Sequence, residues 1–79
     1  MALVPAVLLR TLGERVRTQR LSLGLSQEQL AERAGLNRNY IGGIEQGRRN
    51  VATVNLVRLA VALKLDPGDL LANLHKARR

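Results

Sequence analysis

The residues best suited to contact another molecule lie in one short polar run, Asn37-Arg38-Asn39-Tyr40. Arginine carries a planar fork of donors that matches the O6 and N7 atoms of guanine, and asparagine pairs in a similar way with adenine. The same side chains also bind phosphate oxygens. The run therefore has the chemistry to contact base edges. The alternative is that Asn37 only caps a helix and that Arg38 is a solvated surface charge.

Two predicted helices position this run. Ser26, followed three residues later by Gln29, is a capping-box signature for the start of the first helix. Gly35 supplies a tight turn, and Asn37 is a good N-cap for the second helix. Two short helices joined in this way have the layout of a helix-turn-helix, in which the second helix enters the DNA major groove. We place this motif at about residues 26–46.

The second helix of the motif contains two adjacent glycines, Gly42 and Gly43. Each costs about 1 kcal/mol relative to alanine inside a helix. Such a loss suggests a close backbone approach, either to a neighbouring helix or to DNA, and Gly43 joins Asn37, Arg38 and Asn39 as a candidate base contact. Because a glycine offers no polar side chain, part of the specificity would then come from DNA shape.

The other segments also predict helices, which gives an all-α fold. The first helix runs from Pro5 to Leu23, a fourth begins with Thr53 as its cap, and a fifth follows Asp66 from Pro67 to about Leu74. Apolar residues recur every three or four positions in these segments. The expected core stripes are Leu9, Leu12, Val16 and Leu23, and Leu56, Leu59, Ala60 and Leu63. Leu70, Leu71 and Leu74 add more apolar surface than so small a core can hide.

The composition narrows the function. The chain has 79 residues, which suits a single domain over 1–79, and it has no cysteine for a disulfide or a thiolate metal site. Thirteen basic residues, eleven of them arginines, face six acidic residues and give a net charge of +7. A small basic protein attracts nucleic acid, although a surface charged only for solubility is the alternative.

Several other classes of function are disfavoured. His75 is the only histidine, and we find no catalytic set, metal cluster or phosphate-binding glycine loop, so neither an enzyme nor a cofactor is expected. The apolar start of the chain is too short to span a bilayer and lacks a basic region before it. We therefore expect a cytoplasmic protein without a membrane partner. A single tyrosine gives no platform for stacking RNA bases.

Several segments of the chain together match a known pattern: Arg17-Thr-Gln-Arg20, Gly24-Leu-Ser-Gln-Glu-Gln-Leu-Ala31, Gly35, Tyr40-Ile41, Ile44-Glu-Gln-Gly47, and Leu56, Leu59, Ala60 and Leu63. With these segments the sequence resembles the Cro/C1-type (XRE-like) helix-turn-helix family, and within it most closely the controller proteins of restriction–modification systems. The resemblance implies a compact five-helix, lambda-repressor-like domain. It also implies a homodimer formed through about residues 65–76, for which the candidate interface residues are Leu65, Leu70, Leu71 and Leu74.

The resemblance also assigns roles to individual residues. It implies a structural salt bridge between Arg20 and Glu45, which would fix the second helix of the motif. It places polar residues of the motif and of the loop after it against DNA phosphates. These candidate phosphate contacts are Gln27, Tyr40, Arg48, Arg49, Asn50 and Thr53, with Arg17 as a weaker candidate.

The sequence thus predicts a regulator that binds duplex DNA as a homodimer on a two-fold-related operator, with no small-molecule effector. The main alternative is an antitoxin or phage-type repressor whose principal partner is a protein. A segment that folds on a toxin would have to come from the ends of the chain, and both ends are short.

Overall fold

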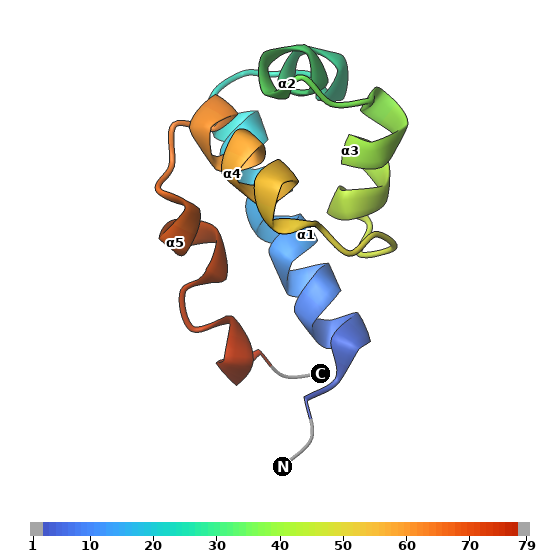
Figure 1. The fold of residues 1–79 in the computed structure, drawn as a ribbon, viewed down its shortest axis with the longest axis vertical. Coiled ribbons are helices and arrows are strands. Elements are labelled where there is room, and N and C mark those ends of the chain that lie inside the picture. The colour runs from blue at the N-terminus through green and yellow to red at the C-terminus, as the bar shows by residue number, and fades with distance from the viewer. Residues whose placement is uncertain (1–2, 78–79) are drawn as a thin grey trace.

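The computed structural model describes residues 3–77, and within that range it contains helices and no strand (Figure 1). The predicted all-α, five-helix fold is confirmed, and residues 1–2 and 78–79 of the predicted domain lie outside the described range. In chain order the elements are α1 (Pro5–Ser22), α2 (Gln27–Ala34), α3 (Arg38–Glu45), α4 (Thr53–Ala62), α5 (Pro67–Leu71) and a 3-10 helix, η1 (Leu74–Lys76).

The long helix α1 is the element against which the others are arranged. In Figure 1, α2 lies across one end of α1, while α3 and α5 lie on opposite sides of it, in agreement with the packing of α1 against both. Helix α2 also packs against α3 and α4. All five helices contribute to the core, and its largest fully buried side chains are Val16, Leu30, Ile41, Ile44, Leu59, Leu63 and Leu70.

The local signals that start and stop α2 are present as predicted. The Ser26 hydroxyl accepts a hydrogen bond from the Gln29 N–H at 3.0 Å, and the Gln29 side chain accepts one from the Ser26 N–H at 2.8 Å. Gly35 ends the helix in the left-handed region, with φ +68°. Because this reciprocal cap and the glycine turn are set by adjacent residues, they fix the entry into α3 locally.

One close helix contact was not predicted. A Cβ atom at Gly13 on α1 would overlap the carbonyl oxygen of Ile44 and would lie 2.7 Å from that of Glu45. Only a glycine lets the backbone of α1 approach the end of α3 so closely. The sequence predicts such an approach at Gly42 and Gly43 and gives no sign of the one at Gly13.

Two predictions about helix ends are wrong. The N-cap of α4 is Ala52, with no side-chain cap, so Thr53 is the first residue of the helix and not its cap. Helix α5 ends at Leu71, three residues earlier than predicted, because Ala72 leaves the helical conformation with ψ 123° and Asn73 follows with a positive φ of +57°. The start of α5 is as predicted, with Asp66 as the cap and Pro67 in the first turn.

The predicted dimer contact by Leu70 is also wrong. This side chain has 0% exposure and belongs to the core, because the inner face of α5 packs on α1. The Arg15 guanidinium, from α1, donates a hydrogen bond to the Leu70 carbonyl at 2.9 Å. Leu65 and Leu74 are partly buried against the core, whereas Leu71 is 46% exposed.

Among the described helices, none combines the length and the apolar character needed to cross a lipid bilayer.

Candidate nucleic-acid interface

The predicted base-contacting tip lies at the start of α3 and is open to solvent. Asn37, Arg38 and Asn39 are all exposed. The Asn37 side chain accepts a hydrogen bond from the Asn39 N–H at 2.7 Å, so Asn37 caps α3, which the sequence offered as the alternative to base contact. Arg38 has only a long contact of 3.6 Å with Glu28, and the side chain of Arg38 stays 57% exposed. Ion pairs of this exposed kind contribute little, so the guanidinium is free to exchange partners.

A buried ion pair fixes the other end of α3. Arg20 of α1 donates to the Glu45 carboxylate through Nε at 2.6 Å and through Nη2 at 2.9 Å, and its Nη1 donates to the Leu25 carbonyl at 2.8 Å. Both residues are only 8% exposed. The hydrogen bond with Glu45 raises the pKa of Arg20 above its ordinary value, against the opposing effect of burial. The predicted structural salt bridge between Arg20 and Glu45 is therefore present.

Gln27, the first residue of α2, also binds the Glu45 carboxylate. Its side-chain amide donates to Glu45 at 3.1 Å, and its carbonyl oxygen lies 3.7 Å from where a Cβ of Gly42 would be. In this structure the amide donor of Gln27 is thus used within the protein, between α2 and α3. The phosphate contact suggested for Gln27 stays a prediction.

The base contact suggested for Gly43 stays a prediction, and in this structure a side chain covers the position. Gly43 is buried because the side chain of Arg49 lies across it, and a Cβ at that position would be 2.6 Å from Cγ of Arg49. The close approach expected from the helical glycine is real. Its cause is a side chain from the following loop and not a neighbouring helix.

Tyr40 packs its apolar ring against the protein and uses its hydroxyl in a polar contact, as expected for a tyrosine. Its ring packs against the core, and its hydroxyl lies 3.4 Å from the Asn55 side-chain amide, from which it accepts a hydrogen bond. The Arg49 guanidinium carbon stands 5.9 Å from the centre of the ring. Asn55 was not among the predicted residues, and no signal in the sequence linked it to Tyr40.

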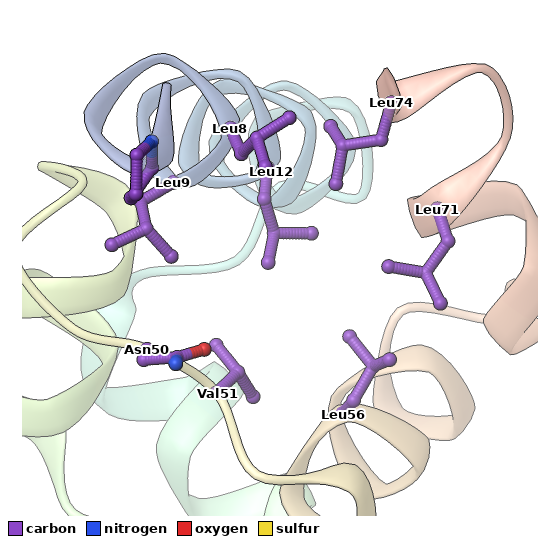
Figure 2. Close-up of a pocket in the computed structure, with 9 residues that line it drawn as sticks. Leu8, Leu9, Leu12, Asn50, Val51, Leu56, Leu71 and Leu74 are labelled. Carbon is purple, nitrogen blue, oxygen red and sulfur yellow. The ribbon is translucent and has the colours of Figure 1, made fainter. Parts of the chain in front are cut away.

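The remaining candidate phosphate contacts share solvent exposure but come from different elements. Arg48 and Asn50 lie in the loop after α3, Thr53 begins α4, and Arg17 is on α1. Asn50 also borders an apolar pocket of about 250 Å³ between α1, the loop before α4 and the C-terminal segment (Figure 2). Their contacts with DNA stay predictions.

The structure thus contains a capped helix, a glycine turn, and a second helix whose polar tip projects from the fold. This arrangement is the DNA-binding motif of helix-turn-helix proteins. Comparison with known proteins agrees with this class. Residues 11–74 match the helix-turn-helix domain family, and the chain belongs to that family.

Similar proteins of this family are controllers of restriction–modification systems. The chain is 50% identical over 60 residues to control protein C.SmaI of Serratia marcescens, covering 76% of this chain and 71% of that protein. It is 47% identical over 60 residues to control protein C.BamHI of Bacillus amyloliquefaciens, covering 75% and 74%. The predicted resemblance to controller proteins is thereby confirmed.

Solved structures of a controller protein and of another regulator have similar folds. The restriction–modification controller protein C.AhdI from Aeromonas hydrophila is 50% identical, with a TM-score of 0.77 over 78% of this chain and 94% of that one. SinR, the master regulator for biofilm formation, was solved in complex with DNA. It is 30% identical, with a TM-score of 0.73 over 76% of this chain and 97% of that one.

Proposed function

We propose that this protein is a cytoplasmic transcription regulator of the restriction–modification controller type, which binds duplex DNA as a homodimer. The observation that carries the proposal is the exposed tip Asn37–Asn39 at the start of a helix whose far end is held by the buried Arg20–Glu45 pair. The similarity to C.SmaI, C.BamHI and C.AhdI supports the controller assignment.

Arg38 is the principal base reader in this proposal, with Asn39 and Asn37 beside it. Arg38 presents five donors on an exposed side chain at the helix tip, where the second helix of the motif meets base edges. Asn37 keeps its side-chain NH₂ for DNA, because only its oxygen is used in capping. The phosphate contacts come from Gln27, Tyr40, the 48–50 loop, Thr53 and Arg17.

The proposed unit is a symmetric dimer. Two reader helices on one face of a duplex require half-sites about one helical turn apart, roughly 34 Å. The dimer surface lies within residues 65–76, with Leu71 as its most exposed leucine and with Leu65 and Leu74 half-buried beside it. Two copies, each of charge +7, bring +14 to the operator, so affinity should fall steeply as salt rises.

Regulation then follows from occupancy. The bound dimer blocks or recruits RNA polymerase according to where the operator lies. We expect no small-molecule effector, so that the protein's own concentration and its dimerisation set the response. The alternative, an antitoxin or phage-type repressor with a protein partner, is not better supported by the comparisons.

Selection of bound duplexes from a random pool tests this function. The wild-type protein should enrich a two-fold-related sequence. Arg38→Ala should relax the preference at one position per half-site, a loss of about 1–3 kcal/mol of discrimination. Arg49→Ala should instead weaken all duplexes alike and lower the salt slope by about 1.

Arg58→Ala is the matched control, since it removes one exposed arginine from α4, outside the helix-turn-helix. It should leave the enriched sequence unchanged. If the wild-type protein enriches no duplex, the proposal is wrong.

A further inference from the structure

We propose that Tyr40 and Gly43 form a seat that holds the Arg49 side chain along α3, so that Arg49 meets a DNA phosphate as an ordered fork. We call these two residues the arginine seat. In the seat both are positioning residues, since there they act through Arg49, whatever contact Tyr40 makes with a phosphate itself. The inference rests on the proposed function and adds to it how one DNA contact is organised before the duplex arrives.

Gly43 provides the space. A Cβ at this position would lie 2.6 Å from Cγ of Arg49, 3.5 Å from its Nε and 3.6 Å from its Cδ. The first of these distances is far below normal van der Waals separation, so a methyl group and the stem of Arg49 cannot share this part of the helix surface. The absence of a side chain at Gly43 is thus what lets Arg49 lie flat on α3.

Tyr40 gives the side chain its direction. It lies three residues before Gly43, on the neighbouring turn of the same helix face. Cγ of Arg49 is against Gly43 and its guanidinium carbon is 5.9 Å from the centre of the Tyr40 ring. The side chain therefore runs back along α3, from Gly43 towards the exposed tip that begins at Asn37.

The seat itself is held in place by the fold. The Tyr40 ring packs against the core, and its hydroxyl accepts a hydrogen bond from Asn55 of α4. A cation is attracted to the face of such a ring, although 5.9 Å is near the limit of this attraction. The space over Gly43 is consequently the main constraint on Arg49, and the ring adds to it.

Order in Arg49 matters because a long side chain normally loses rotamer freedom when it binds. Arginine binds phosphate through two parallel donors, which requires a defined orientation of the fork. A seated Arg49 has part of that orientation already, and the residue as a whole is exposed. A glycine that weakens the helix relative to alanine would in this way strengthen DNA binding.

The test is a double-mutant cycle on the duplex that the wild-type protein selects. Gly43→Ala should lower affinity about five-fold, the order expected from freeing one long side chain. In an Arg49→Ala background, Gly43→Ala should change affinity by less than about two-fold, because residues that act through each other are not additive. Equal losses in both backgrounds would mean that the methyl group obstructs DNA directly. Either that result or no loss in the first background overturns the proposal.

Gly42→Ala is the control for folding. It adds the same methyl group to the same helix, but its nearest neighbour, the Gln27 side-chain oxygen, is at an ordinary 3.7 Å. Both alanine variants should melt at or above the wild-type temperature, since alanine favours the helix. A large loss of stability in Gly43→Ala alone would contradict the assumption that Arg49 simply moves aside.

A measurement on the free protein separates this proposal from the proposed function. The Nε–H signal of Arg49 in an NMR relaxation experiment should report a more ordered side chain than that of exposed Arg48. Gly43→Ala should remove that order, and Gly42→Ala should keep it. An Arg49 that is as mobile as Arg48 in the wild-type protein would overturn the seat, even if DNA binding is found. An ordered Arg49 without DNA binding would leave the seat standing and refute the function.

Discussion

The helix-turn-helix, α2 and α3, and the C-terminal pair, α4 and α5, share one apolar core but differ in the polar contacts that hold them. The end of α3 is tied down by directional polar contacts, in which the Glu45 carboxylate accepts hydrogen bonds from Arg20 and Gln27. Helix α5 is held by one buried side chain, Leu70, by the packing of its five residues on α1 and α4, and by one hydrogen bond from Arg15 to the Leu70 carbonyl.

The difference matters because the two regions present different surfaces. A base-reading tip has to be exposed and polar, so it contributes little burial, and the rest of α3 must fix its angle. Buried Ile41 and Ile44 and the ion pair of Glu45 do so. A self-associating surface gains its energy from apolar area, so the dimer contact proposed for α5 needs an exposed leucine beside the buried one. Leu70 and Leu71 are adjacent in sequence, but Leu70 is buried with 0% exposure and Leu71 is exposed at 46%.

The largest loss of stability is expected from removing the Arg20–Glu45 ion pair. Glu45→Ala should lower the free energy of unfolding by about 3–5 kcal/mol, because it leaves the Arg20 charge buried without its partner. Urea denaturation followed by circular dichroism measures this. Glu28→Ala removes the exposed carboxylate near Arg38 and should change stability by less than about 0.5 kcal/mol. Equal midpoints for the two variants would show that the buried pair is not what fixes α3.

The two neighbouring leucines of α5 give the next largest effect. Leu70→Ala should destabilise the protein by about 2–5 kcal/mol, because it leaves a cavity in the core. Leu71→Ala should cost much less stability but should weaken self-association, which sedimentation measures over a range of concentrations. If Leu70→Ala weakened self-association and left unfolding unchanged, the placement of Leu70 in the core would be wrong.

The smallest loss of stability is expected from removing the helix caps of the two regions. Ser26 caps α2 and Asp66 caps α5, each in a reciprocal box with a residue three positions later. Ser26→Ala and Asp66→Ala should each cost about 1 kcal/mol. Amide hydrogen exchange should show faster opening in the helix whose cap is removed. A loss of several kcal/mol for either variant would mean that the cap also supports tertiary packing.

Some of the site could be predicted residue by residue. Ser26, Gly35 and Asn37 act as the sequence indicated, because caps and turns depend on partners two to four residues away. The Arg20–Glu45 pair came from the family resemblance, and the structure contains it. Asn37–Asn39 are exposed as a reading tip requires, whereas their contacts with DNA stay predictions.

Other features depended on contacts between residues that are far apart in the chain. The sequence marked Gly43 as unusual but gave no means of telling whether DNA, a helix or a side chain filled the space above it. Arg49 fills it, and nothing in the pattern of apolar residues described the path of that side chain. Gly13 is a similar case, because its partners, the carbonyls of Ile44 and Glu45, lie on another helix.

The sequence by itself determined that the chain is helical, where most of the helices begin, and which residues make a polar tip, because neighbouring residues decide these features through caps, turns and periodicity. Only the tertiary structure decided which leucine of α5 is buried, which glycine allows α1 to meet α3, and where Arg49 lies. Those outcomes depend on how closely whole helices pack, and shifts of an ångström or less between distant elements settle them.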